Sequence, residues 1–295
     1  MYDITHHQNT NILEVNNSKN QVHAKICLND GASLQELKLN SHEIIQDLSP
    51  LTYDNTYASS ILFPFANRIK DGIYSFNNTL YQFDINQKEE NNALHGLVYN
   101  KTFHVVETKV DDNSATIKLE YVEKSKPKGF PYTYSIILEY EFTKTHVCLK
   151  IDVKNTDGEA FPFTLGWHPY FVSDNLFKSA LKFESTQKLM IGERNITTGI
   201  KEIKPSELFQ VKNKQLDDCW ILNSGVIQFL TPKYKLILES SEKNNFLQLY
   251  TPPKLNTIAI EPTTGVSDSF NNNIGLQILK PKETYSITWN LRINN

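Results

Sequence analysis

Short strand-like runs separated by turn-forming clusters constrain the fold of this 295-residue chain more than any other feature. The runs alternate apolar with polar residues, or they are rich in β-branched and aromatic residues, as β-strands are. They lie at residues 22–28, 115–122, 132–142, 147–153, 226–230, 235–239 and 285–293. Clusters such as Asp30-Gly31 and the three asparagines at 271–273 are typical of turns between strands. The sequence therefore predicts a nearly all-β protein.

Helical periodicity is almost absent from the chain. Apolar residues repeat at helical spacing over no more than two turns, and residues 206–210 are a weak helix candidate. This disfavours a parallel sheet with crossover helices. No linker rich in Ser, Gly or Pro divides the chain, and strand-like runs continue on both sides of every loop. We therefore predict one domain over residues 1–295, a large antiparallel β-sandwich.

Charge and cysteine content narrow the function classes. The formal net charge is -3, so the chain lacks the strong basic charge typical of proteins that bind nucleic acid or a membrane surface, and a small neutral molecule is the expected partner. The three cysteines, Cys27, Cys148 and Cys219, show no disulfide or zinc-site spacing. No export signal or membrane-spanning run is visible. We expect a cytoplasmic protein without a metal, and the oligomeric state stays open.

Two segments each bring a polar side chain into an apolar setting. Asn67-Arg68 lies among aromatic residues, and Arg68 fits either a functional site or a surface position reached by snorkelling from a buried strand. His95 follows a polar loop and precedes Gly96, which permits close approach of the backbone. For His95 alone, a structural hydrogen-bonding role is the more ordinary explanation.

His168 and Glu261 are candidates for acid–base chemistry. His168 lies among Trp167, Tyr170 and other aromatic residues, whose faces suit the C–H faces of a sugar ring. Glu261 ends an apolar run before a turn, where burial would raise the pKa of its carboxyl towards that of a general base near neutral pH. Taken singly, a core histidine and a surface glutamate explain the two residues as well.

An acidic pair, Asp217-Asp218, precedes Trp220 and offers acceptors for sugar hydroxyls. A metal site is the competing interpretation. It is disfavoured because no neighbouring His, Asp or Glu supplies a recognisable ligand spacing.

Together these segments resemble the aldose 1-epimerase (galactose mutarotase) family, in the same order and over roughly residues 34–293. The family's conserved blocks are similar to Asn67-Arg68-Ile69, Leu94-His95-Gly96, His168-Pro169-Tyr170-Phe171 and Ile260-Glu261-Pro262. The family's sugar-binding Asp resembles Asp217, but many members have His where this chain has Asp218, so either Asp could bind the sugar. Many galactose-active members also carry Gly-Arg where this chain has Phe63-Pro64. The sugar itself is therefore left open.

The resemblance implies a galactose mutarotase-like supersandwich and an enzyme that interconverts the α and β anomers of a free aldose without a cofactor. It implies that Glu261 is the general base and His168 the general acid. Four residues would bind the sugar, namely Arg68, His95, Asp217 and Asn67.

Two other functions are compatible with the same resemblance. A hexose-6-phosphate 1-epimerase needs cationic contacts to phosphate, and the arginines besides Arg68 are Arg194 and Arg292, neither in a basic cluster. A non-catalytic carbohydrate-binding protein could share the fold, since fold does not dictate function, but both the acid and the base are retained here. A glycosidase is disfavoured because it normally pairs two carboxylates.

Overall fold

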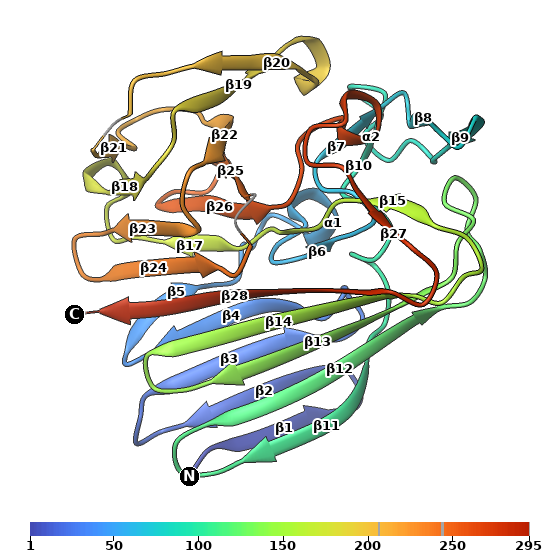
Figure 1. Cartoon of the computed structure of the whole chain (residues 1–295). Helices are drawn as coiled ribbons and strands as arrows, with labels where there is room; N and C mark the ends of the chain where they lie inside the picture. The colour runs from blue at the N-terminus through green and yellow to red at the C-terminus, as the bar shows by residue number, and fades with distance from the viewer. Residues whose placement is uncertain (206, 243–244, 295) are drawn as a thin grey trace.

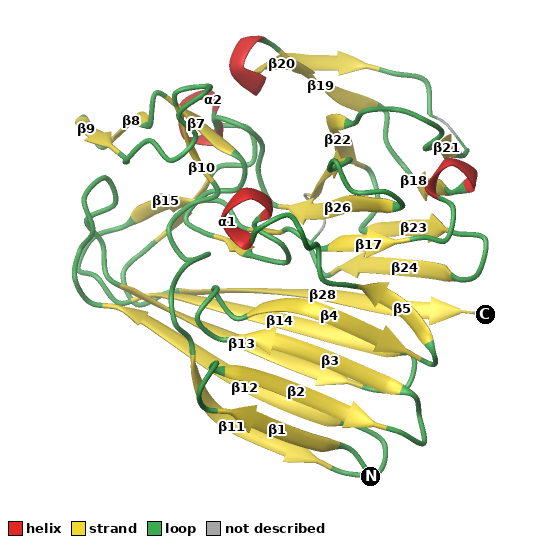
Figure 2. Cartoon of the chain, turned by 180° about the vertical axis from the view of Figure 1, so that it is seen from behind, coloured by secondary structure: helices red, strands yellow, loops and turns green. Residues whose placement is uncertain are grey.

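The computed structural model describes residues 1–205, 207–242 and 245–294. Strands form most of the described chain, and its helices are short turns of three or four residues (Figure 2). These turns are α1 (Tyr53–Thr56), η1 (Leu176–Lys178), η2 (Glu193–Asn195) and α2 (Ser269–Asn272). The predicted all-β class is confirmed.

The largest sheet has nine antiparallel strands. In spatial order they are β11 (His104–Val110), β12 (Ala115–Glu123), β13 (Tyr134–Phe142), β14 (His146–Asn155), β28 (Thr284–Asn294), β24 (Lys235–Ser240), β23 (Val226–Leu230), β18 (Ala180–Phe183) and β21 (Phe209–Gln210). Buried and more exposed residues alternate along β13, β14 and β28, because one face of the sheet packs into the core.

A second sheet of five strands forms the other layer of the sandwich. It contains β1 (Asp3–His7), β2 (Ile12–Asn17), β3 (Val22–Cys27), β4 (Ser33–Leu39) and β5 (His42–Ile45). Figure 1 shows these blue strands running along the green strands β11 to β14. The hydroxyl of Tyr140 in β13 donates a hydrogen bond to the carbonyl of Ala32, just before β4, at 3.2 Å. A continuous hydrophobic core fills the space between the layers.

A third antiparallel sheet lies over the β28 side of the nine-stranded sheet (Figure 1). Its strands are β20 (Thr197–Glu202), β19 (Gln187–Ile191), β22 (Asp217–Leu222), β25 (Asn245–Tyr250), β26 (Thr257–Thr263), β16 (Gly166–Trp167) and β6 (Ile61–Leu62), and β17 (Tyr170–Val172) also pairs with β26. Trp167 stacks on Trp289 of β28 with ring centroids 6.3 Å apart. This contact joins the third sheet to the nine-stranded sheet.

Three two-stranded ribbons complete the fold. They pair β7 (Arg68–Lys70) with β10 (Asn92–Leu94), β8 (Ile73–Phe76) with β9 (Thr79–Gln82), and β15 (Phe161–Phe163) with β27 (Gln277–Leu279). In the first ribbon, Arg68 lies opposite Leu94, so the Asn-Arg and Leu-His segments of the sequence meet.

The strand predictions agree with the structure, and the helix prediction does not. Each of the seven predicted runs forms a strand within two residues of its expected ends. Residue 206 lies outside the described residues, while Phe209–Gln210 form β21 instead of a helix, because they pair with β18 at the sheet edge. The asparagines at 271–273 end α2 instead of separating strands. No helix of the described chain is long and apolar enough to cross a membrane. The extent of the domain stays a prediction.

Candidate active site

One face of the third sheet carries a group of polar residues. Gln248 of β25 lies opposite Glu261 of β26, and Asp217 of β22 lies opposite Tyr250. Because side chains alternate along a strand, the residues between them, such as Leu249 and Ile260, point to the other face and into the hydrophobic core. The apolar sequence around Glu261 therefore buries the strand while one carboxylate remains on the polar face.

Glu261 and His168 are in direct contact. The His168 ring nitrogen Nε2 lies 3.5 Å from Glu261 Oε1, and both residues are buried. The His168 ring stacks on Tyr170 at 4.8 Å and meets the edge of His95 at 5.1 Å. The hydroxyl of Tyr170 donates a hydrogen bond to the carbonyl of Thr56 at 3.0 Å, which fixes the position of the Tyr170 ring against His168.

Burial determines the protonation of this pair. Desolvation raises the pKa of Glu261 well above its ordinary value, with a smaller contribution from the nearby Asp217 charge. Desolvation lowers the pKa of His168 to about 3. Both shifts favour an uncharged imidazole beside a carboxyl that keeps its proton to higher pH than an exposed glutamate does.

Two histidine nitrogens at the site are unsatisfied. Nδ1 of His95 and Nδ1 of His168 are both buried and have no hydrogen-bond partner within the described chain. Buried polar atoms of this kind are rare unless a water or a ligand pairs with them. Desolvation, with the neighbouring His168 and Arg68, lowers the pKa of His95 well below its ordinary value. His95 is thus held neutral, and its backbone is in the left-handed region at φ 62°.

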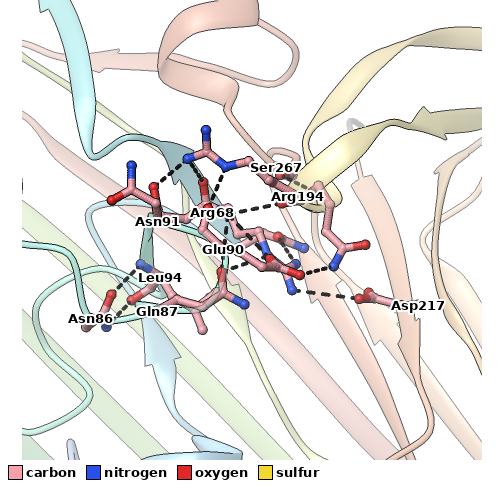
Figure 3. A network of polar contacts seen from close by, with 12 residues as sticks. Arg68, Asn86, Gln87, Glu90, Asn91, Leu94, Arg194, Asp217 and Ser267 are labelled. Atoms are coloured by element: carbon pink, nitrogen blue, oxygen red, sulfur yellow. Dashed lines mark hydrogen bonds and ion pairs between the residues drawn. The ribbon is translucent and has the colours of Figure 1, made fainter.

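All three nitrogens of the Arg68 guanidinium group lie close to neighbouring side chains. Its Nε donates to Glu90 Oε2 at 2.9 Å and to Gln87 Oε1 at 3.1 Å, and Nη1 donates to the side-chain oxygen of Asn67 at 2.9 Å. Nη2 lies 3.8 Å from Asp217 Oδ2 (Figure 3). A guanidinium has five N–H donors, so donors on the terminal nitrogens remain for a ligand.

The two acidic residues of the Asp217-Asp218 pair face opposite sides of β22. Asp217 accepts a hydrogen bond from Gln248 Nε2 at 2.6 Å and lines the same pocket as Glu261. Burial raises the pKa of Asp217, against the lowering effect of Arg68. Asp218 forms an ion pair with Lys188 and does not line the pocket. Of the two acidic residues, Asp217 is therefore the one that lines the pocket.

All six residues selected from the sequence line one pocket of about 150 Å³. They are Asn67, Arg68, His95, His168, Asp217 and Glu261. The volume corresponds to that of about five water molecules, which suits a small ligand. Larger cavities exist, such as one of about 850 Å³ beside β18, but the lining of that cavity contains neither histidine nor arginine.

Several lining residues were not identified from the sequence. They are Asn55, Thr56, Tyr57, Gln87, Leu94, Tyr170, Gln248 and Tyr250, of which Leu94 and Tyr170 had appeared only as neighbours of His95 and His168. Gln248 could have been found from its position on a strand, because it is the one polar residue between two leucines in a buried run. Tyr57 packs its ring against His95 at 4.8 Å, a tertiary contact without a local sequence signal.

A metal centre was not expected from the sequence. Within residues 1–205, 207–242 and 245–294, no three His, Cys, Asp or Glu side chains converge as a potential metal site. The expectation that the protein works without a metal stays a prediction.

Comparison with known proteins identifies a family. The sequence profile described as aldose 1-epimerase matches residues 12–292. The protein YihR of Escherichia coli K12, described as uncharacterized, is 21% identical over 280 residues, which cover 88% of this chain and 87% of YihR.

Solved structures share the fold. A galactose mutarotase-like protein from Clostridium acetobutylicum has a TM-score of 0.87 at 20% identity, over 100% of this chain and 98% of that one. A galactose 1-epimerase from Lactobacillus acidophilus has a TM-score of 0.81 at 17% identity, over 100% and 98% of the two chains. The fold is thus galactose mutarotase-like, as predicted. Because the profile matches residues 12–292, nearly the whole of this chain, the chain belongs to the aldose 1-epimerase family.

Proposed function

We propose that the protein is a mutarotase, which interconverts the α and β anomers of a free aldose. The observation that carries the proposal is the 3.5 Å contact between His168 Nε2 and Glu261 Oε1 inside a small polar pocket. Family membership supports a carbohydrate epimerase, and the pair supplies the acid and base that ring opening requires.

The proposed reaction moves two protons in opposite directions. Glu261, as the carboxylate, takes the proton of the anomeric hydroxyl, while His168, as the imidazolium, donates a proton to the ring oxygen. The bond between C1 and the ring oxygen breaks, which gives an aldehyde at C1 and a free hydroxyl at C5. Rotation about the C1–C2 bond exposes the other face of the aldehyde. Reversal of both proton transfers closes the ring as the opposite anomer and restores both residues.

When the free pair holds a single proton, it is one proton shift away from this reactive state. Glu261 protonated beside neutral His168 and ionised Glu261 beside protonated His168 contain the same number of protons. A transfer across the 3.5 Å contact therefore prepares the pair without exchange with solvent. Such contacts are often long in free enzymes and tighten when substrate binds.

The remaining residues would hold the sugar. Arg68 and Asn67 offer a donor and an acceptor, Asp217 offers a carboxylate to hydroxyls, and His95 offers its unpaired Nδ1. Correct placement of the anomeric centre matters because misplaced reactants lose most of the catalytic advantage. Tyr170 and Tyr250 add aromatic rings to the lining.

The charges around the pocket favour a neutral sugar over a sugar phosphate. Arg68 is the pocket's cationic side chain among the described residues, and it is already paired with Glu90 and close to Asp217. A phosphate would meet more carboxylates than cations. We therefore favour a free aldose and expect glucose 6-phosphate not to compete with glucose.

Polarimetry of Glu261→Gln tests the proposal. The amide keeps the shape of the carboxyl but cannot act as a base, so anomer exchange should fall by about 10²–10⁴-fold while calorimetric binding of the sugar persists. His168→Asn should show a loss of similar size. A variant that exchanges anomers at the unaltered rate would exclude these roles, and a wild-type protein that binds aldoses without exchanging them would favour a binding protein.

A further inference from the structure

Arg68 is connected to a turn that lies outside the pocket. Glu90 links them, because its Oε2 accepts from Arg68 Nε at 2.9 Å and its Oε1 accepts from Asn195 Nδ2 at 2.6 Å (Figure 3). Glu90, Arg194 and Asn195 do not line the pocket. A single carboxylate thus joins the sugar-facing arginine to the turn between β19 and β20.

The side chain of Arg194 fixes the loop that carries Glu90. Its Nε donates to the main-chain carbonyl of Glu90, and its Nη2 donates to the carbonyl of Asn91 and, at 2.8 Å, to Asp71 Oδ1. In return, the side chain of Asn92, which is fully buried, donates to the carbonyl of Arg194 at 3.0 Å. The loop and the turn therefore hold each other through both side-chain and backbone groups.

The backbone of the turn is unusual. Arg194 and Asn195 are both in the left-handed region, at φ 59° and φ 56°. Two successive residues there, neither of them glycine, are uncommon and persist where surrounding contacts hold them. Here the contacts include the Arg194 hydrogen bonds and a bond of 2.8 Å from the Ser267 hydroxyl to the carbonyl of Asn195. The conformation directs both side chains at Glu90 and its loop.

We propose that the Arg194-Asn195 turn is a positioning element that orients Arg68 for the sugar through Glu90. Engagement of Nε by Glu90 fixes the plane of the guanidinium group and leaves donors on its terminal nitrogens for hydroxyls. The identity of the ligand as a sugar rests on the proposed function, whereas the orientation of Arg68 by the turn does not. The residues concerned are positioning residues, since they act through Arg68.

A donor–acceptor exchange tests the link. Glu90→Gln places an amide nitrogen against either Arg68 Nε or Asn195 Nδ2, which are both donors. Asn195→Asp places two carboxylates against each other. The double variant restores the order, because the introduced amide can accept from Arg68 and donate to the introduced carboxylate. Rescue in the double variant would show that the hydrogen-bonded link between the two residues, and not either side chain alone, carries the effect.

The chain has three arginines, Arg68, Arg194 and Arg292, so NMR can follow the Arg68 Nε–H directly. Each single variant should increase the hydrogen-exchange rate of the Arg68 Nε–H by about tenfold or more. In the double variant this rate should return to within about fivefold of the wild-type rate. In polarimetry the single variants should raise KM about tenfold, with kcat changed less than about threefold. Arg292→Gln, which removes an exposed ion pair with Glu239, is the matched control and should change neither.

Two outcomes would overturn the inference. One is Arg68 Nε–H exchange that stays at the wild-type rate in both single variants. The other is a double variant that shows the combined losses of the singles in exchange or in KM. If the wild-type protein exchanges the anomers of no aldose, the proposed function fails, while the Nε–H measurements still decide whether the turn positions Arg68.

Discussion

The protonation of two buried residues decides how the proposed site depends on pH. In the structure Glu261 and His168 are buried against each other, and burial shifts their pKa values in opposite directions, upward for Glu261 and downward for His168. The order of the two pKa values is thereby inverted relative to exposed groups. Between its two pKa values the pair holds a single proton, and its ionised form is reached by a shift of that proton.

We therefore expect kcat/KM, which reports the free protein, to show no transition near pH 6.5, where exposed histidines titrate. An acidic limb needs a second proton on the pair, and burial has lowered the pKa of His168 to about 3. An alkaline limb needs loss of the single proton, and the pKa of Glu261 is raised well above its ordinary value. Polarimetry corrected for spontaneous mutarotation measures this profile. A fall in kcat/KM centred near pH 6.5 would show that His168 titrates as an exposed histidine does.

The same burial predicts that Glu261→Gln stabilises the fold above about pH 5. Between the ordinary Glu pKa and the raised one, the carboxyl stays protonated in the folded protein but ionises in the unfolded chain. Ionisation lowers the free energy of the unfolded state as pH rises, so the folded state becomes relatively less stable. The wild type then loses about 1.4 kcal/mol of unfolding free energy per pH unit up to the raised pKa. The amide has no such loss.

Urea unfolding of both proteins at about pH 4.5 and pH 7.5 measures this effect. The difference in favour of Glu261→Gln should grow with pH. A constant difference would mean that Glu261 ionises alike in both states. Lost activity combined with gained stability would mark the site as one where function is kept at the expense of stability.

At the scale of strands and loops, Gly96 fixes how the segment of His95 approaches Phe63. Gly96 has φ 77°, and a Cβ atom there would lie 2.2 Å from the carbonyl oxygen of Phe63. Leu97 N donates to the same carbonyl at 2.7 Å. The glycine therefore permits the backbone contact that places His95 in the pocket.

Gly96→Ala should lower the unfolding free energy by more than about 2 kcal/mol, because a positive φ and a backbone collision act together. Chemical denaturation measures the loss. Gly158→Ala is the control, since a Cβ at Gly158 would meet no atom within 4 Å and should change stability by less than about 0.5 kcal/mol. Equal effects of the two substitutions would contradict a special role for Gly96.

The elements that the sequence predicted differ in kind from those it did not. Long strands with one buried face, such as β13, show the alternation that a single sequence reveals. The short strands beside the site, such as β16 and β17, are buried throughout and show no alternation. Their sequence has the composition of any core segment, so they are defined only by their pairing with neighbouring strands, β26 for both and β6 for β16.

The same distinction separates predicted from missed site residues. Residues within recognisable blocks, such as Arg68 and His168, could be selected from the sequence. The choice of Asp217 over Asp218 needed the strand register, which decides the face that each residue occupies. Arg194 and Glu90 gave no local signal, because their roles depend on contacts between segments 104 residues apart.

At the scale of the whole molecule, the pocket combines residues of the third sheet with residues of a two-stranded ribbon. The third sheet supplies Asp217, Gln248 and Glu261, while the ribbon of β7 and β10 supplies Arg68. The sequence predicted a sandwich but not its order, since β28 near the C-terminus pairs with β14 and β24 from distant segments. Such pairings between distant segments are not encoded in local periodicity.

These connections predict that the chain unfolds as one cooperative unit, as expected for one domain over residues 1–295. A single hydrophobic cluster includes residues from the five-stranded, nine-stranded and third sheets. Trp167 and Trp289 lie on different sheets and stack on each other, so their fluorescence reports the contact between the sheets. Because separation of the sheets would expose this shared core, neither sheet is expected to persist without the other.

Urea unfolding followed by tryptophan fluorescence and by far-ultraviolet circular dichroism measures this cooperativity. The two transitions should coincide, and Trp289→Phe should shift both midpoints to lower urea by the same amount, because the loss of packing is shared. If fluorescence changed at lower urea than circular dichroism, the third sheet would separate before the sandwich unfolds. The site would then rest on an independently stable sandwich, and the chain would contain two folding units instead of one.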